Sequence, residues 1–565
     1  MAGKNGAPIP PQEVPAYDDF MAAFRVEDLD AMLSGDPAEG LNVCVECADR
    51  HADGERIALY WEGANGESSV HTFADLRDGA ARFANFLKAR GIGPGDRVAI
   101  MLPRIPELMI AALGIWRAGA VYTPMFTAFG PKAIEYRLER SAAKLVVTDR
   151  TNRPKLGGID NMPPIMVVAR APDDALALGD FDFHDELASQ EADFEPVLRG
   201  ADDPFLLMFT SGTVSSPKSL AVPHKALLSF IVYMKYAVGL RPGDKYWNMA
   251  DPGWAYGLYY AVVGPLLLGN ATHFSEGAFS VEGTYKMLEK YEINVLCSAP
   301  TAYRLLMAGG GDLADACEAQ LRAACAAGEP LNPEVIHWVA DHLGCPVRDH
   351  YGQTEIAMVV NNHHGLDHHT PPGSMGLSMP GFRVVIVDDA CNELGPGKPG
   401  RIAVDIDASP LYWFLGYEAN PSPIEGRYYI TGDMAELDKD GCITFTGRDD
   451  DMISSAGYRI GPFDVESCLI EHEAVAESGV VGKADAERGE IVVAFVVLAP
   501  GHNGSPDLAR ELQLYTRDRL SAHAYPREVV FVDELPKTPS GKIQRFKLRQ
   551  RTKNADLDPD GKATV

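Results

Sequence analysis

Short apolar runs alternate with amphipathic helical patterns from about residue 41 to residue 200. Two of the runs, R-V-A-I-M (97–101) and K-L-V-V-T (144–148), are separated from neighbouring segments by turns such as G-I-G-P-G-D (91–96). Strands that alternate with helices are typical of βα units and a mainly parallel sheet. A second region of this kind runs from Phe205 to about Gly365, with strands predicted at 205–209 and 295–298.

The pattern changes twice further along the chain. From about Gly373, short strands such as 382–387 and 401–406 predict a β-rich module with Gly/Pro turns. After Gly447, a strand at 491–498 and a helix near 508–520 predict a compact α+β segment. We therefore expect an α/β protein: a large N-terminal domain of two doubly wound α/β subdomains plus a β-rich subdomain, then a small, mobile C-terminal domain. The expected bounds are an extension at 1–40, the N-terminal domain at 41–449 and the C-terminal lid domain at 450–565, with the hinge at 449–451.

Size and charge restrict the function. A chain of 565 residues is too long for one hydrophobic core. A net charge of −28 argues against nucleic acid or an anionic membrane as a partner. The longest apolar stretch, 259–268, contains a Gly-Pro pair and is too short to span a bilayer, and the N-terminus lacks the apolar run of a signal peptide. We expect a cytoplasmic protein.

Cysteines and histidines offer two metal hypotheses that we do not favour. Cys44 and Cys47 form a C-x-x-C near His51, but no second ligand pair follows at zinc-site spacing, so buried thiols are the preferred interpretation. The nine cysteines are expected to be reduced thiols. The stretch H-H-x-x-x-H-H (363–369) is interpreted as a solvated loop.

Six motifs occur in a fixed order along the chain. They are F-T-S-G-T-V-S-S-P-K (209–218), Y-G-Q-T-E (351–355), T-G-D (431–433), G-R-D-D-D-M-I (447–453), G-Y-R-I (457–460) and P-K-T-P-S-G-K-I-Q-R (536–545). Together they resemble the adenylate-forming (ANL) superfamily of acyl-CoA synthetases, and most closely its short- and medium-chain fatty acid ligases. The resemblance spans most of the chain. It implies ATP, Mg²⁺ and coenzyme A (CoA) as co-substrates of a small-molecule carboxylate.

The first motif predicts a phosphate-binding loop. Hydroxyls, backbone N–H groups and a lysine can hold phosphate oxygens without a rigid cage, and the spacing is not that of P-loop NTPases. The predicted contacts come from Thr210, Ser211, Gly212, Thr213 and Lys218. A Ser/Thr-rich surface loop is the alternative. The chain departs from the family pattern T-S-G-T-T-G-x-P-K-G at Val214, Ser215 and Ser219. A serine held in a left-handed conformation there costs roughly 1 kcal/mol relative to glycine.

The resemblance assigns nucleotide contacts to four further segments. Thr354 would contact the α-phosphate and Glu355 would hold Mg²⁺, with Tyr351 and Gln353 beside the nucleotide. The alternative for Thr354 is a helix N-cap. Asp433 would accept hydrogen bonds from the ribose hydroxyls, and Arg448 would reach ribose or phosphate. The adenine pocket would be lined by Gly328, Glu329 and Pro330.

The resemblance also implies two half-reactions. The carboxylate attacks the α-phosphorus of ATP, giving acyl-adenylate and pyrophosphate; the CoA thiol then attacks the acyl carbon and expels AMP. Lys542 would stabilise charge in the first step, whereas an exposed loop lysine is the alternative. Rotation of the C-terminal domain about Asp450 would then admit CoA. CoA contacts are expected at Gly457, Arg459 and Arg517.

Substrate choice is predicted to lie in an acyl pocket. Its walls are expected at Trp254, Ala255, Tyr256 and Ala327, with Gly352 at the floor. Acetate-specific relatives carry a tryptophan at the position of Gly352, so the floor is expected to be open and a Gly352→Trp change to favour acetate. We therefore expect propionate to medium-chain acids, or a branched or small aromatic acid.

Other functions are less well supported by the same residues. One alternative is an adenylate-forming enzyme with a non-CoA acceptor such as a carrier protein, although no carrier domain follows Lys542 in this sequence. Luciferase-type oxygenation is a more distant one. A nucleotide-binding protein with an impaired phosphate loop is suggested by the three loop departures, but intact Glu355, Asp433, Arg448 and Lys542 argue against it. A homo-oligomer is left open.

Overall fold

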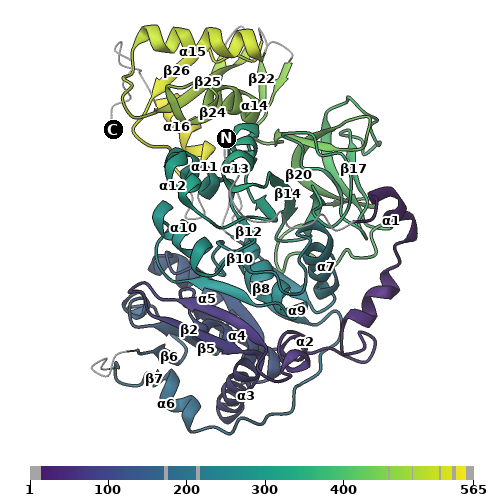
Figure 1. Cartoon of the computed structure of the whole chain (residues 1–565), viewed down its shortest axis with the longest axis vertical. Helices are drawn as coiled ribbons and strands as arrows, with labels where there is room; N and C mark the ends of the chain where they lie inside the picture. The colour runs from purple at the N-terminus through teal and green to yellow at the C-terminus, as the bar shows by residue number, and fades with distance from the viewer. Residues whose placement is uncertain are drawn as a thin grey trace.

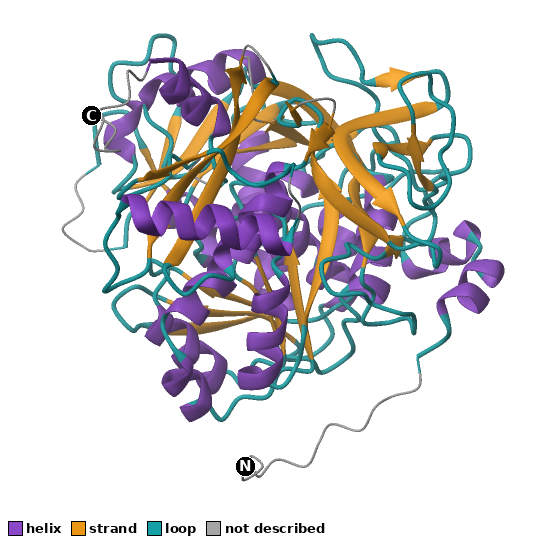
Figure 2. Ribbon diagram, turned by 90° about the horizontal axis from the view of Figure 1, so that it is seen from above, coloured by secondary structure: helices purple, strands orange, loops and turns teal. Residues whose placement is uncertain are grey.

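The structure is a computed structural model that describes residues 14–170, 176–210, 217–455, 458–485, 488–520, 523–537 and 542–554. Within these ranges the strands form four sheets, of seven, nine, five and five strands. Figure 1 shows the C-terminal elements at one end of the molecule, next to α11–α13 of the larger part. In Figure 2 strands run between helices, and the β-rich region is mostly strands and loops. The predicted fold class is confirmed.

The first sheet is parallel except at one edge. Its strands in spatial order are β7 (Phe181–Asp182), β6 (Ile165–Val168), β5 (Leu145–Asp149), β3 (Arg97–Met101), β4 (Val121–Pro124), β8 (Pro204–Thr210) and the antiparallel β9 (Lys218–Pro223). Helices α3 (Phe73–Ala89), α4 (Pro106–Arg117), α5 (Pro131–Ser141) and α6 (Phe183–Ala188), with the 3₁₀ helix η3 (Arg153–Leu156), accompany it. Buried strands such as β3 read as continuous apolar runs because both faces are covered.

The second sheet has six parallel strands flanked by antiparallel edges. In spatial order its strands are β16 (Leu377–Ser378), β15 (Ala357–Asn361), β14 (Val347–Gln353), β13 (Ala323–Ala327), β12 (Val295–Ser298), β10 (Tyr246–Asn248), β11 (Thr272–Ser275), β1 (Ile57–Glu62) and β2 (Ser68–Thr72). Its helical segments are α7 (Ala226–Val232), η4 (Tyr233–Ala237), α8 (Ala255–Gly257), η5 (Leu258–Val263), α9 (Gly264–Leu267), α10 (Val281–Lys290), α11 (Pro300–Ala308), α12 (Gly311–Ala316) and α13 (Pro333–Leu343).

The division of the chain between these two sheets differs from the prediction. The strand predicted at 205–209 was assigned to the second region, yet β8 pairs with β4 in the first sheet. Conversely, β1 and β2 precede the first sheet in sequence and pair at the edge of the second. Apolar periodicity identifies a strand but not its partner, which long-range packing decides.

The two smaller sheets follow the predicted change of pattern. The β-rich sheet contains β17 (Val384–Val387), β18 (Gly400–Asp405), β20 (Tyr428–Leu437), β19 (Ile424–Glu425) and β21 (Ile443–Arg448). The C-terminal sheet contains β23 (Tyr458–Ile460), β22 (Ile453–Ser455), β25 (Gly489–Leu498), β24 (Val475–Asp485) and β26 (Glu528–Phe531). It packs with α14 (Pro462–Ile470), α15 (Pro506–Arg519) and α16 (Arg545–Asn554). The boundary predicted at 449–451 falls between β21 and β22.

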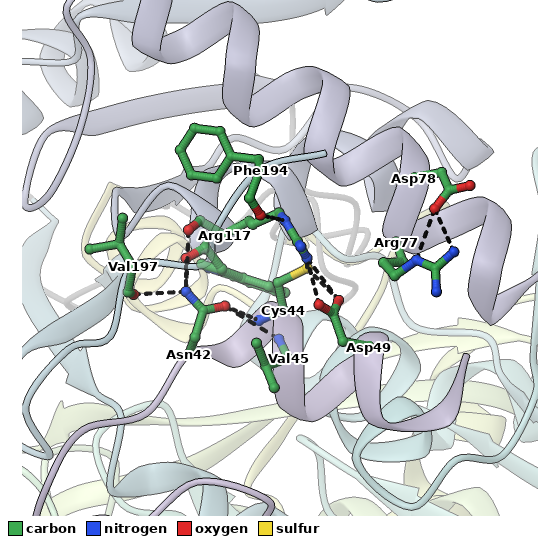
Figure 3. Close-up of polar contacts among 10 residues, drawn as sticks. Asn42, Cys44, Val45, Asp49, Arg77, Asp78, Arg117, Phe194 and Val197 are labelled. Carbon is green, nitrogen blue, oxygen red and sulfur yellow. Dashed lines mark hydrogen bonds and ion pairs between the residues drawn. The ribbon is translucent and has the colours of Figure 1, made fainter. Parts of the chain in front are cut away.

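The N-terminal segment lies along the large domain and is tied to it by polar contacts. It contains α1 (Tyr17–Ala23), η1 (Val26–Met32), α2 (Val43–Cys47) and η2 (Asp49–His51). Figure 3 shows Asn42 capping α2 through Oδ1 while Nδ2 donates to the Val197 carbonyl at 2.8 Å. The same Nδ2 also donates to the Trp116 carbonyl at 2.8 Å. Beside it, Arg117 pairs with Asp49 at 2.7 Å. These contacts join three sequence segments, around residues 42–49, 116–117 and 197.

The prediction for Cys44 and Cys47 is confirmed, whereas the prediction for the histidines is partly wrong. Cys44 and Cys47 are buried on α2 as predicted, and burial raises the pKa of both thiols. The solvated loop predicted for 363–369 is wrong at its start. His363 is fully buried and His364 hydrogen-bonds the Ala324 carbonyl at 3.0 Å, and burial lowers the pKa of both imidazoles. His363 is removed from solvent beside β15, and His364 is half-buried against β13.

Candidate active site

One cleft of about 1980 Å³ gathers most of the predicted site residues. It is bordered by the ends of β13 and β14, by β20 and β21, and by residues of the C-terminal domain. The predicted residues that line it are Thr210, Lys218, Trp254, Ala255, Tyr256, Ala327, Gly328, Glu329, Pro330, Tyr351, Gly352, Gln353, Thr354, Glu355, Asp433, Arg448 and Lys542. Residues more than 300 positions apart in sequence therefore share one cavity.

The Y-G-Q-T-E segment forms the end of β14 and a turn. Thr354 and Glu355 lie in the turn that leads to β15, so the helix N-cap interpretation of Thr354 is wrong. The turn is closed by a register shift after Tyr351 and by Ala357, whose φ of 61° is left-handed. A non-glycine residue in this conformation costs roughly 1–3 kcal/mol and is found where the surroundings enforce it. The strained turn holds Thr354 and Glu355 at the cleft.

Three polar side chains converge on Asp433. Its carboxylate accepts hydrogen bonds from the Tyr351 hydroxyl at 2.6 Å and from Gln353 Nε2 at 2.9 Å. Arg448 lies 3.3 Å from its other oxygen. Burial raises the pKa of Asp433, whereas Arg448 is the largest opposing influence. The register of β20 and β21 pairs Asp433 with Arg448, which explains their proximity.

Glu355 is buried beside an aromatic residue that the sequence did not single out. The Tyr417 hydroxyl donates to Glu355 at 2.7 Å, and the Lys218 ammonium lies 4.7 Å from the centre of the Tyr417 ring. Burial raises the pKa of Glu355, and the Tyr417 hydrogen bond and Lys218 oppose the rise. Mg²⁺ in nucleotide sites is held by one or two carboxylates together with phosphate oxygens. A buried carboxylate next to a lysine of the predicted phosphate loop fits that arrangement.

The phosphate loop is described only at its two ends. Thr210 ends β8 and is the register partner of Lys218, which begins β9. Ser211, Gly212 and Thr213, with Val214 and Ser215, lie outside the described residues. Ser219 lies within β9 and is absent from the described non-glycine residues of positive φ, so the left-handed strain expected of it is wrong there. Its hydroxyl instead donates to Glu418 at 3.0 Å.

The C-terminal domain brings Lys542 to the cleft. Lys542 borders the same cavity as Asp433, and its positive charge opposes the rise in the pKa of that carboxyl. A direct interdomain hydrogen bond runs from Asn332 Nδ2 to the Ser467 hydroxyl at 3.0 Å. The structure thus has the C-terminal domain closed over the nucleotide motifs.

The predicted acyl walls form an aromatic part of the cavity. Trp254 packs against Phe126 and Phe129, with ring centres 5.5 and 5.6 Å apart. The floor at Gly352 differs from expectation. A Cβ added there would lie 2.0 Å from the Ala357 carbonyl oxygen and 2.6 Å from Met358 Cα. The missing side chain is replaced by the backbone of β15, and Gly352→Trp is therefore expected to disrupt the turn instead of filling open space.

Besides those of the phosphate loop, four predicted residues lie elsewhere or are not described. Arg517 is on α15, where it pairs with Asp518 at 2.8 Å and does not line the cleft. Asp450 pairs with Arg448 at 3.3 Å. Gly457 lies outside the described residues, and Arg459 is placed only as a backbone position on β23.

Sequence reasoning missed three cleft residues besides Tyr417. Asp349, two positions before Tyr351, has a buried carboxyl whose pKa is raised by burial. Arg304 pairs with Glu329 at 2.6 Å. Asp451, the last residue of the hinge predicted at 449–451, also borders the cleft, a position that the sequence did not indicate. Asp349 could have been predicted because it lies two residues before the Y-G-Q-T-E motif. The Arg304–Glu329 ion pair joins two separate segments, so no local sequence pattern predicts it.

Comparison with known proteins identifies the family. The sequence model of the family described as AMP-binding enzyme matches residues 46–411, and that of the AMP-binding enzyme C-terminal domain matches residues 464–542. The chain belongs to the AMP-binding enzyme family. The acetyl-coenzyme A synthetase of Bacillus subtilis (strain 168) is 38% identical over 523 residues, covering 90% of this chain and 90% of that protein.

Solved structures of the AMP-binding enzyme family agree. The crystal structure of Brucella canis acyl-CoA synthetase is 53% identical, with a TM-score of 0.79 over 95% of this chain and 99% of that chain. The anthranilate CoA ligase AuaEII in complex with anthranoyl-AMP is 26% identical, with a TM-score of 0.83 over 94% of this chain and 99% of that chain. The predicted enzyme class is confirmed: the chain is an AMP-forming acyl-CoA synthetase, a class that uses ATP, Mg²⁺ and CoA.

Proposed function

We propose that this enzyme converts a carboxylic acid longer than acetate to its CoA thioester, with both half-reactions carried out at the cleft. The observation that supports this most is the convergence of Lys542, Asp433 and Glu355 on one cavity. They come from the C-terminal domain, the β-rich sheet and the second α/β sheet. A site that must activate a carboxylate with ATP needs a cation over the reacting groups, an acceptor for the ribose and a carboxylate for Mg²⁺.

The nucleotide is proposed to lie along the ends of β13, β14 and β20. Asp433 accepts the ribose hydroxyls, and the hydrogen bonds from Tyr351 and Gln353 fix its orientation. Gly328, Glu329 and Pro330 line the adenine. The φ of 95° at Gly328 requires glycine, which lets the backbone turn beside the base. Arg448 reaches the ribose or a phosphate, since its guanidinium already borders Asp433.

The phosphates are proposed to meet Thr354, Thr210 and Lys218, with Ser211, Gly212 and Thr213 completing the loop. Glu355 would hold Mg²⁺ together with phosphate oxygens, and the metal would neutralise charge on the leaving pyrophosphate. The hydrogen bond from Tyr417 fixes the orientation of the Glu355 carboxylate.

Lys542 is proposed to bridge the substrate carboxylate and the α-phosphate. A preorganised ammonium at the point where negative charge develops lowers the barrier without reorganising solvent. As the carboxylate oxygen bonds to phosphorus, the bond to pyrophosphate breaks and the adenylate forms.

The second half-reaction requires Lys542 to leave. We propose that the C-terminal domain rotates about Asp450, which brings the segment with Gly457 towards the cleft to line a thiol channel. Arg459 and Arg517 then meet the phosphates of CoA. The CoA thiol attacks the acyl carbon, and AMP leaves.

The acyl group is proposed to lie against Trp254, Ala255, Tyr256 and Ala327, all of which border the cavity. Aromatic walls favour apolar and planar groups, and solved relatives include ligases of anthranilate and benzoate. We therefore place the substrate among propionate to medium-chain, branched or small aromatic acids. Nine free cysteines, eight of them buried, support a reducing, cytoplasmic setting.

A direct test incubates the purified protein with ATP, Mg²⁺, CoA and a panel of carboxylic acids, and detects acyl-CoA by mass spectrometry. Thioesters of acids longer than acetate are the expected products. Acetate as the best substrate would contradict the proposed range, and AMP release without thioester would indicate another acceptor.

The pocket assignment has its own test. Ala255→Leu adds three carbons to the proposed wall, so kcat/KM for a medium-chain acid should fall about tenfold or more relative to propionate. Ala316→Leu, on α12 outside the cleft, is the matched control. An unchanged chain-length profile for Ala255→Leu would contradict the pocket.

A further inference from the structure

Four charged residues beside Lys542 form a cluster that the predicted mechanism does not use. The cluster, called here the hinge clamp, consists of Asp451, Glu466, Arg545 and Arg549. Arg545 Nη2 donates to both oxygens of Glu466, at 2.9 and 2.7 Å, and its Nη1 lies 3.6 Å from Asp451. Arg549 pairs with the other oxygen of Asp451. Asp451 therefore receives two arginines from one helix, α16.

Three of the four residues of the hinge clamp are largely removed from water, whereas the Arg549 side chain is 29% exposed. The side chains of Asp451 and Glu466 are 10% and 6% exposed, and that of Arg545 is 19% exposed. Glu466 also accepts the Val480 N–H at 2.7 Å. Removal of one partner from a buried ion pair leaves an uncompensated charge, which costs far more than the loss of a surface pair. Asp451 is thus one of two buried carboxylates, with Glu466, that hold the arginines of α16.

Asp451 is connected through Arg448 to the predicted nucleotide-binding residues. Its backbone N–H donates to the Arg448 carbonyl at 3.1 Å, and the Arg448 side chain pairs with Asp433. The chain turns tightly here because Met452 N–H donates to the same carbonyl at 3.0 Å. The carboxylate of Asp451 is thereby held close to the wall of the cleft.

The hinge clamp is also connected to Lys542, through the chain segment between Lys542 and Arg545. Arg545 begins α16 three residues after Lys542. The segment between them is anchored by Gln544 N–H donating to the Pro536 carbonyl at 2.7 Å and by Ile543, which packs in a cluster with Leu535 and Leu548. The apolar contacts of Ile543 anchor this segment to the core of the C-terminal domain. The ion pairs of Arg545 and Arg549 with Asp451 orient it towards the turn at 448–452.

We propose that Asp451 is a positioning residue for adenylate formation, acting through Arg545 and Arg549 to hold Lys542 over the cleft. The inference rests on the proposed role of Lys542. Since Lys542 serves only the first half-reaction, loss of Asp451 impairs that half-reaction and spares the second. A residue that merely stabilises the C-terminal domain would affect both.

The test measures the two half-reactions separately in the full chain. Adenylation is followed by ATP–pyrophosphate exchange at saturating ATP, and thioester formation by supplying purified acyl-adenylate with CoA. Asp451→Asn should lower the exchange rate by about tenfold to a hundredfold, the range expected when a catalytic group is displaced by about 1 Å. Thioester formation from supplied adenylate should stay within about twofold of the unmodified enzyme.

Two further variants keep the test decisive. Asp451→Glu restores the carboxylate and should recover part of the exchange rate, and the double variant Asp451→Asn/Arg549→Gln should be no slower than Asp451→Asn alone. Asp440→Asn, in an exposed turn, is the matched control. Unchanged exchange in Asp451→Asn, or an equal fall of both half-reactions with a lower thermal midpoint, overturns the inference. If Lys542→Ala itself retains exchange, the proposed role of Lys542 fails, and the positioning role falls with it.

Discussion

Among single residues, Asp433 lies where three donors from two strands, β14 and β21, meet. Tyr351 and Gln353 share one of its oxygens and Arg448 faces the other, so the carboxylate is fixed before any nucleotide arrives. Preorganised acceptors of this kind favour binding because little conformational freedom is lost. The same network makes Asp433 intolerant of replacement by an amide of equal shape.

Asp433→Asn places an N–H donor against Gln353 or Arg448 and removes the charge. Hydrogen bonds to charged groups are worth about 1.5–3 kcal/mol, so we expect the KM for ATP to rise by roughly tenfold to a hundredfold. Steady-state kinetics with ATP as the varied substrate measure this, with the exposed Asp440→Asn as control. A KM within twofold of the unmodified enzyme would remove Asp433 from the nucleotide site.

At the scale of elements, the first turn of α14 contains a buried acidic residue, Asp464, close to two other carboxylates. Burial, with Glu466 on the same helix and Glu436 on β20, raises the pKa of Asp464 to about 6. A raised carboxyl pKa means that the folded state binds more protons than the unfolded state between about pH 4 and pH 6. Stability therefore falls as the pH rises through this window and Asp464 ionises.

Asp464→Asn removes that penalty. We expect the free energy of unfolding to increase by about 2 kcal/mol at pH 7.5, allowing for partial exposure, and by about a third of that at pH 4.5. Urea unfolding at the two pH values tests this, and Asp507→Asn in the exposed first turn of α15 is the control. A gain of equal size at both pH values would show that the pKa of Asp464 is not raised.

The elements also show where prediction from sequence succeeds. Strands at 97–101 and 295–298 match β3 and β12 because buried parallel strands are continuous apolar runs. Motif residues such as Lys218, at the start of β9, and Gln353, at the end of β14, fall at strand ends that meet at one cleft. No local sequence pattern predicts contacts between distant segments. Such contacts decide which sheet a strand joins, and they form the hinge clamp and the Tyr417–Glu355 hydrogen bond. The open floor expected at Gly352 failed for the same reason, since β15 occupies that space.

At the scale of the whole molecule, a chain of net charge −28 must bind anionic substrates. The cleft offsets the negative net charge locally, because Lys218, Arg448 and Lys542 lie around one cavity. Lys542 comes from the C-terminal domain. No helix within the described ranges is long and apolar enough to cross a membrane. Because one of the three cations belongs to the smaller domain, the charge of the site depends on domain orientation.

This dependence can be tested at Asp450, the proposed hinge residue. Asp450→Pro fixes φ near −65° and removes an N–H, so rotation about this residue should be blocked. We expect ATP–pyrophosphate exchange to persist within about threefold, whereas thioester formation should fall by about a hundredfold or more.

Since Asp450 also pairs with Arg448 at 3.3 Å, Asp450→Ala separates loss of that ion pair from loss of rotation. Both half-reactions should survive in the alanine variant. Equal loss of both in Asp450→Pro would place the hinge elsewhere.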